Sequence, residues 1–167
     1  FQQKNSEEAI KIINKSIKIN PKQADVNNNL GLMLANLKKY DDAILSYKRA
    51  IKINDRFIDA YFNLGITYKE LGILNKAVFY WEKVIEIQPK NFKAYNNIGN
   101  IHLEKNKNVL AVKYYDKAIF LNKNFDLAYF NHGNALQKLA KLNESINSFS
   151  EAIKLNPAYS EAYANRG

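Results

Sequence analysis

Small and large apolar residues recur along the chain with a period of 34 residues, and this period organises the rest of the sequence. Glycines stand at positions 31, 65, 99, 133 and 167, and no insertion or deletion disturbs their spacing. Two further columns keep the same period, one of small residues (Ala9, Ala43, Ala77, Ala111, Ser145) and one of large apolar residues (Ile13, Tyr47, Trp81, Tyr115, Phe149). Self-similarity at a fixed period of this length indicates a solenoid of stacked repeats.

Each period predicts two helices. Within residues 58–91, apolar or small residues follow one another at three- and four-residue steps, which places them on one face of a first helix. They are Tyr61, Leu64, Gly65 and Tyr68. The pattern breaks near residues 72–75 and resumes on a second apolar face that carries Ala77 and Trp81. Pro89 is expected to end this second helix, because proline has no N–H and disfavours helical backbone in the residue before it.

Short polar residues stand where each second helix is expected to begin. Asn75 is predicted to cap the second helix of its repeat, since an asparagine side chain accepts a hydrogen bond from a free N–H of the first turn. Short polar residues at or next to the same position in the other repeats are Ser6, Asp41, Asn108 and Asn143. Their recurrence predicts that a second helix begins at each of them.

The recurring glycine requires a packing explanation. Glycine inside a helix costs about 1 kcal/mol relative to alanine, so its return at Gly31, Gly65, Gly99 and Gly133 indicates a compensating contact. We predict that each first helix approaches its partner so closely here that a Cβ would collide. Alanines of the partner helix and the large residue beside them would then fill the remaining space.

These residues resemble the tetratricopeptide repeat. The segment 60–65, followed by Tyr68, Gly72, Ala77, Trp81 and Pro89, is similar to its signature at nearly every position. The resemblance implies an all-α, right-handed α-solenoid of antiparallel helix-turn-helix repeats, forming one domain over residues 1–167. The predicted parts are a partial repeat at 1–23, full repeats at 24–57, 58–91, 92–125 and 126–159, and a partial repeat at 160–167. Because both ends fall inside a repeat, we expect a longer protein with more repeats.

The resemblance also implies a function. In this family the first helices line a concave groove, so the chain is expected to be a scaffold that binds an extended peptide or a partner protein there. One inward column is asparagine in every repeat, and an amide offers both a donor and an acceptor to a peptide backbone. A second interpretation is that these asparagines hydrogen-bond neighbouring helices. The predicted groove residues are Asn29, Asn63, Asn97, Asn131, Asn165, Phe62, Asn96, Asn100, Phe130 and Asn134, with Leu32 and Ile66 in the column of Asn100 and Asn134.

Two branches of the family can be compared with this groove. Cochaperones that hold carboxylate tails use lysine and arginine where this chain has Glu161 and Asn165, so an acidic tail would be repelled. The asparagine column is more similar to the repeat region of O-linked N-acetylglucosamine transferases. That resemblance gives an alternative function, the substrate-recruiting arm of a larger glycosyltransferase.

The charge of the chain adds a third, weaker alternative. Lysine and arginine number 25 against 16 acidic residues, for a net charge of +9. Most lysines fall on second helices and loops, for example Lys48, Lys83 and Lys117. We interpret them as a solvated face, because no lysine cluster carries the interleaved aromatic residues of a nucleic-acid platform. We therefore do not interpret nucleic-acid binding through these lysines as the main function.

The sequence offers little material for catalysis. There is no cysteine, and the two histidines, His102 and His132, fall at core-facing positions of different repeats without a carboxylate at metal-ligand spacing. We expect no histidine–carboxylate pair, no phosphate-binding glycine loop and no cofactor, and hence no enzyme and no small-molecule substrate. No apolar run is long enough to span a membrane and no secretory leader is evident. The expectation is an intracellular protein with protein or peptide partners, able to self-associate through uncapped solenoid ends.

Overall fold

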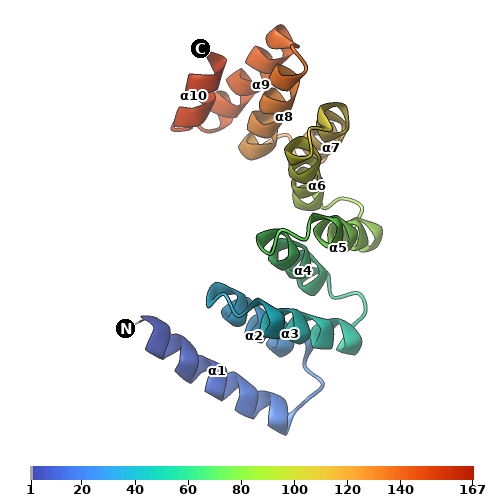
Figure 1. The fold of residues 1–167 in the computed structure, drawn as a ribbon, viewed down its shortest axis with the longest axis vertical. Helices are drawn as coiled ribbons and strands as arrows, with labels where there is room; N and C mark the ends of the chain where they lie inside the picture. Colours follow the sequence, from blue (N-terminus) through green and yellow to red (C-terminus); the bar gives the residue numbers. More distant parts are fainter. Residues whose placement is uncertain (1) are drawn as a thin grey trace. The chain divides into compact units, whose positions relative to one another are not determined.

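The computed structural model describes the backbone of residues 2–167 and the side chains of residues 8–167, and its regular structure in that range is entirely α-helical (Figure 1). The helices are α1 (Gln2–Ile19), α2 (Ala24–Asn36), α3 (Tyr40–Ile53), α4 (Ile58–Glu70), α5 (Leu74–Ile87), α6 (Phe92–Glu104), α7 (Asn108–Leu121), α8 (Asp126–Lys138), α9 (Leu142–Leu155) and α10 (Ser160–Arg166). The predicted all-α fold is confirmed. Helices α2 to α9 form four helix-turn-helix pairs, one in each predicted full repeat, with α2, α4, α6 and α8 as the first helices.

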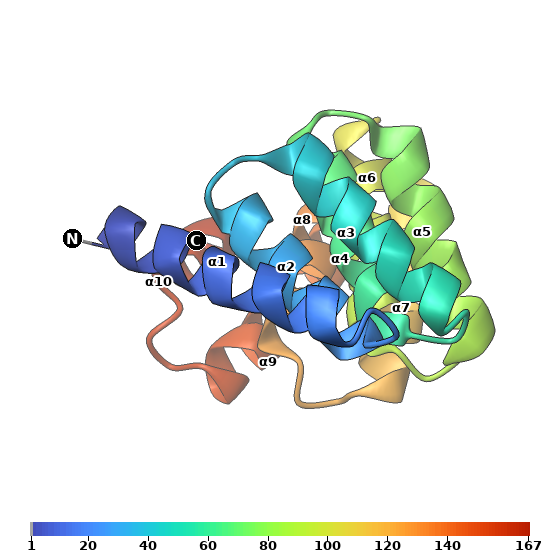
Figure 2. The same ribbon diagram turned by 90° about the horizontal axis from the view of Figure 1, so that it is seen from below.

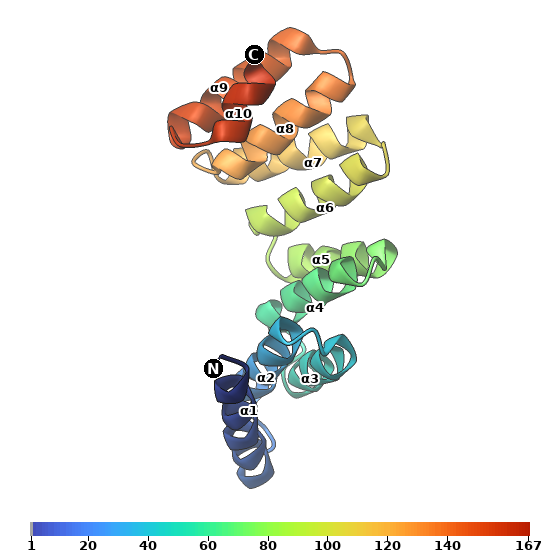
Figure 3. The same cartoon turned by 60° about the vertical axis from the view of Figure 1, so that its left-hand side comes forward.

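Contacts between helices divide the chain into an N-terminal half, residues 1–87, and a C-terminal half, residues 88–167. In the N-terminal half α2 packs on α3 and α4 on α5, while α3 also contacts α4 and α1 lies along α2 (Figure 2). In the C-terminal half α6 packs on α7 and α8 on α9, α7 contacts α8, and α10 lies against α9 (Figure 3). Each helix thus packs mainly on its neighbours in sequence, as expected for a repeat protein.

An aromatic ring lies against the recurring glycine in every full repeat. A Cβ added to any of these glycines would lie no more than 2.6 Å from a ring atom of the second helix in the same repeat. The pairs are Gly31 with Tyr47, Gly65 with Trp81, Gly99 with Tyr115, and Gly133 with Phe149. Ordinary carbon contacts are about 3.5–4.0 Å, and these four rings are at most 1% exposed. The predicted close approach is confirmed, and the obstacle to a Cβ is the ring itself.

The column of small residues completes this interface. Ala43, Ala77 and Ala111 are fully buried. In the last full repeat Ser145 takes their place, and its hydroxyl donates a 2.9 Å hydrogen bond to the carbonyl of Gly133. The serine is therefore accommodated because its one polar atom bonds the backbone of the partner helix.

The second helices do not begin as predicted. Helices α3, α5 and α9 start one residue earlier than expected, so Asp41, Asn75 and Asn143 lie inside the first turn and do not occupy the N-cap position. Asn108 is the first residue of α7. The N-cap residues of α3, α7 and α9 are lysines, and none makes a side-chain capping bond. The prediction of polar caps was therefore wrong for these three helices, although it placed the starts of α3, α5, α7 and α9 to within one residue.

The first helix also differs from the prediction. Residues 2–19 form the single helix α1, so no second helix begins at Ser6. The side chain of Ser6 lies outside the described residues. The sequence pattern missed this because the residues before Ser6 are too few to carry a helical period of their own.

The turn between the two helices of each repeat is closed by backbone hydrogen bonds at the C-terminal end of the first helix. In the repeat of α4 and α5, Gly72 N–H donates to the Lys69 carbonyl and Ile73 N–H donates to the Tyr68 carbonyl, both at 2.8 Å. This pair of bonds is a Schellman motif, which requires left-handed backbone at the position of Gly72. The same bonds recur in the other repeats. The left-handed residues are Lys38 (φ 58°), Gly72 (φ 71°), Asn106 (φ 55°) and Ala140 (φ 58°).

These turns predict opposite effects for two reciprocal substitutions. A Cβ at Gly72 would meet nothing within 4 Å, so the change Gly72→Ala tests backbone conformation alone. We expect it to lower the free energy of unfolding by about 0.5–1 kcal/mol, because left-handed backbone disfavours every residue with a Cβ. Ala140→Gly should raise that free energy by a similar amount. Chemical denaturation followed by circular dichroism measures both, and changes of the same sign in the two variants would contradict the assignment.

Candidate functional site

Two members of the asparagine column bridge the first helices of successive repeats. Asn63 Nδ2 donates to Asn28 Oδ1 at 3.0 Å, which links α4 to α2. In the C-terminal half, Asn131 Nδ2 donates to Asn96 Oδ1 at 3.1 Å and links α8 to α6. The acceptors Asn28 and Asn96 are only 7% and 1% exposed. Asn96 therefore does not present its amide to an open surface, and these two bridges support the interpretation that the column bonds neighbouring helices.

The other column members behave differently from one another. Asn165 Nδ2 donates to Asn134 Oδ1 at 2.9 Å, so α10 is tied to α8. Asn29 is exposed and Asn97 is half-buried, and neither side chain makes a hydrogen bond within residues 8–167. Three of the five asparagines thus have a partner on a neighbouring helix, and each of these bonds uses only one N–H of the donor. The donor's oxygen and second N–H remain available to a ligand.

The remaining predicted groove residues are anchored to the rings beneath the glycines. Asn100 Oδ1 accepts a 2.7 Å hydrogen bond from the hydroxyl of Tyr115. Burial raises the pKa of Tyr115 far above its ordinary value, so the hydroxyl keeps its proton and stays a donor. The Phe62 ring lies 6.4 Å from that of Trp81, centroid to centroid. The Phe130 ring lies 5.8 Å from that of Phe149.

A hollow of about 320 Å³ lies between α2 and α4 in the N-terminal half, and we call it the α2–α4 hollow. Leu32 and Ile66 line it and are 45% and 39% exposed, so both present apolar surface to the hollow. Asn63 stands beside them, and Lys38 and Glu70 add one charge of each sign. The sequence placed Leu32, Ile66 and Asn63 together on the inward face. It missed Tyr40, which lines the hollow from the first position of α3.

One expectation about catalysis was wrong, because His132 does pair with a carboxylate. Its Nε2 lies 3.2 Å from Asp116 Oδ1, and its Nδ1 lies 2.9 Å from the Ser148 hydroxyl. The three residues belong to α7, α8 and α9, and Asp116 and Ser148 each lie sixteen positions from His132, so no local spacing reveals them. Ser148 is only 7% exposed, and its hydroxyl also bonds the Glu144 carbonyl at 2.9 Å. The arrangement therefore ties three helices together and leaves the hydroxyl closed to a substrate.

The other histidine packs against an aromatic ring. The His102 ring stacks on that of Tyr114 with centroids 5.1 Å apart. Burial, and then the nearby Lys107 and Lys105, lower the pKa of His102 below its ordinary value. Residues 8–167 hold no group of three or more metal-ligating side chains. In the part of the chain that the structure describes, no helix is long and apolar enough to cross a membrane.

The chain matches models of one protein family along most of its length. Models described as tetratricopeptide repeat match residues 12–44, 58–91, 92–125 and 127–159, and one described as TPR repeat matches residues 33–72. The matched segments follow the helix pairs of the structure. The protein therefore belongs to the tetratricopeptide-repeat family. No curated protein matches the sequence.

Solved structures share the fold. One is "YrrB: a TPR protein with an unusual peptide-binding site", with a TM-score of 0.77 and 23% identity over 92% of this chain and 79% of that chain. MamA has a TM-score of 0.83 and 21% identity over 96% of this chain and 94% of its own. A tetratricopeptide repeat protein from Parabacteroides merdae has a TM-score of 0.85 and 21% identity over 99% of this chain and 66% of its own. At these identities the likeness establishes the fold alone.

The amide bridges predict a contrast between two members of the asparagine column. Asn131→Ala removes the donor to Asn96 and leaves a buried amide oxygen without its partner. We expect the free energy of unfolding to fall by about 1–2 kcal/mol. Asn97→Ala removes no hydrogen bond, and since alanine is the better helix former the expected change lies within about 0.5 kcal/mol. Urea denaturation of both variants measures the difference, and equal losses would show that the bridge contributes nothing.

Proposed function

We propose that the protein is a scaffold that binds an extended peptide segment of a partner protein along its first helices. The observation that carries this proposal is the α2–α4 hollow, where the exposed Leu32 and Ile66 stand next to the polar amide of Asn63. A mostly apolar recess with a few fixed polar groups is the usual form of a binding site. The bridge to Asn28 fixes the Asn63 side chain in place, and such preorganisation reduces the entropy lost on binding.

The chemistry of the hollow indicates how a peptide would bind. An apolar side chain of the ligand would pack between Leu32 and Ile66. The Oδ1 atom of Asn63 would accept a hydrogen bond from a peptide N–H, and its second N–H would donate to a peptide carbonyl. Lys38 and Glu70 can each pair with an opposite charge on the ligand.

The C-terminal half offers a more polar version of this surface. Asn100 and Asn134 take the positions that Leu32 and Ile66 have in the N-terminal half. Amides in place of apolar side chains would favour backbone and polar side chains of the ligand in that half. We therefore expect the apolar anchor of the ligand to bind in the N-terminal half.

The comparisons support a binding function of this kind without naming the partner. The fold is that of a family built for extended binding surfaces, and YrrB is described as having a peptide-binding site. The alternative of a glycosyltransferase arm rested on the asparagine column. Because three of these asparagines bond neighbouring helices, the column provides no specific support for that alternative.

The proposal predicts that a charge placed in the α2–α4 hollow weakens peptide binding. Peptide arrays would first identify extended peptides that bind the wild-type protein, and fluorescence anisotropy would then give their affinities. Ile66→Glu should reduce affinity roughly tenfold or more, because it replaces an apolar contact of about 1.5–3 kcal/mol by a carboxylate. The matched control is Ile146→Glu on α9, a similarly exposed isoleucine (44%) outside the hollow.

Circular dichroism would confirm that both variants keep their helices. Equal affinity of Ile66→Glu and the wild type for every array-selected peptide would contradict the proposed groove. Equal weakening by Ile66→Glu and Ile146→Glu would indicate a general charge effect and would also count against it.

A further inference from the structure

A second and larger hollow lies on another face of α2. It has a volume of about 490 Å³ and is bounded by α1, α2 and α3, and we call it the α1–α3 hollow. Leu30 and Leu34 of α2, only 4% and 8% exposed, lie at its floor. Ile10 of α1 and the 49% exposed Leu45 of α3 line its walls. No residue that lines the α2–α4 hollow also lines this one. The two are therefore separate sites, although both adjoin α2.

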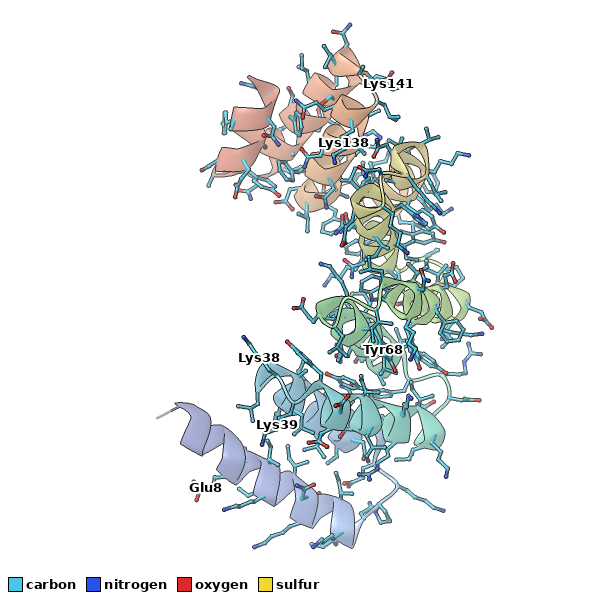
Figure 4. The ribbon with its side chains drawn as sticks, in the orientation of Figure 1. Glu8, Lys38, Lys39, Tyr68, Lys138 and Lys141 are labelled. Atoms are coloured by element: carbon cyan, nitrogen blue, oxygen red, sulfur yellow. The ribbon has the colours of Figure 1, made fainter. Side chains whose placement is uncertain are left out.

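The α1–α3 hollow is open because a large side chain is missing from the first full repeat. In the next repeat, Tyr80 of α5 stacks on Tyr68 of α4 with centroids 5.3 Å apart and planes at 2° (Tyr68 is labelled in Figure 4). The corresponding residues in the first full repeat are Ser46 and Leu34. The Ser46 hydroxyl bonds the carbonyl of Asp42 in its own helix at 2.9 Å, so it does not reach across the space.

The last full repeat fills the corresponding position in another way. Ser148 of α9 stands 102 residues after Ser46, three periods along the chain. There His132, which corresponds to Leu30, bonds both Ser148 and Asp116 and closes the space between helices. The first full repeat has neither the tyrosine ring nor the histidine bridge. The apolar surface that stays exposed at this hollow is that of Leu45, with the half-buried Ile10 across from it.

Positive charge surrounds this apolar floor. Lys11 of α1, Lys39 of the α2–α3 turn and Arg49 of α3 line the hollow, against a single carboxylate from Asp42. Figure 4 shows Lys39 on the side of the turn that faces α1. Among the side chains of residues 8–167, no carboxylate forms an ion pair with any of these three cations. All three cations are exposed to solvent, so a single ion pair with a ligand would contribute little, but together they favour an anionic ligand over a cationic one.

We propose that the α1–α3 hollow binds an aromatic side chain of a partner protein that is flanked by carboxylates. The ring would pack against Leu45 and Ile10, above the buried Leu30 and Leu34, in the space that corresponds to that of Tyr80 in the next repeat. The flanking carboxylates would pair with Lys39 and Arg49. The arginine can donate bidentate hydrogen bonds to one carboxylate. This site does not rest on the proposed peptide groove, because it uses different residues on another face of α2.

Peptide probes test both parts of the recognition. The first is a fluorescein-labelled peptide with one phenylalanine flanked by aspartates. The second replaces the phenylalanine by alanine, and the third replaces the aspartates by asparagines. Fluorescence anisotropy should show that the first peptide binds and that the second and third bind at least about tenfold more weakly. Equal binding of all three peptides would overturn the proposal.

Variants of the protein locate the site. Ser46→Tyr supplies in the chain itself the ring that Tyr80 supplies in the next repeat, so it should keep the fold and lower affinity for the first peptide at least about tenfold. Arg49→Glu should weaken binding strongly. Its matched control, Lys48→Glu, makes the same charge change on the same helix outside the hollow and should have little effect. Ile66→Glu in the α2–α4 hollow should also leave this peptide's affinity unchanged, which separates the two sites.

Several outcomes would overturn the assignment. Unchanged binding by a folded Ser46→Tyr variant would exclude the hollow as the site. If that variant fails to fold, the comparison of Arg49→Glu with Lys48→Glu decides, and equal effects would reject the proposal. Dodecanoate serves as a further probe. If Ser46→Tyr abolishes binding of dodecanoate but leaves binding of the first peptide unchanged, the hollow is a site for lipid-like carboxylates and the peptide proposal is overturned.

Discussion

The contact between a glycine of the first helix and an aromatic ring of the second helix is the constraint on which every full repeat depends. Each ring occupies the space that a Cβ would need, and each is almost completely buried. The ring thereby fixes how closely the two helices approach and how the first helix is rotated about its axis. That rotation decides which residues of the first helix enter the core and which face outward.

Both candidate sites follow from this rotation. With Gly31 against Tyr47, residues Leu30 and Leu34 of α2 face the α1–α3 hollow, while Leu32 lines the α2–α4 hollow. Substitutions in columns outside the glycine contact change the surface while the helix pair is kept. Ser46 in place of a tyrosine opens one hollow, and asparagines in the column of Leu32 make the other surface polar in the C-terminal half. The chain thus combines a constant interior with binding surfaces that differ between repeats.

The sequence predicted the features that depend on spacing within one repeat. The helix pairs and the collision at the glycines are of this kind, because a periodic pattern directly records which residues share a buried face. The helix starts were displaced, since the turn is set by left-handed backbone after the first helix, and Lys38 and Ala140 give no glycine signal for it. The sequence also did not specify two contacts between repeats, the pair of His132 with Asp116 and the bridge from Asn131 to Asn96. They depend on how one repeat meets the next, which spacing within a repeat does not encode.

The most direct test of the glycine–ring contact is a double-mutant cycle of Gly133→Ala and Phe149→Leu, measured by chemical denaturation. Gly133→Ala alone should destabilise the protein, because its Cβ would meet the Phe149 ring. In the Phe149→Leu background the methyl group gains room, so the same change should cost at least about 1 kcal/mol less. A coupling energy of this sign and size would confirm that the ring excludes the Cβ. Additive losses, with no coupling between the two positions, would contradict the account.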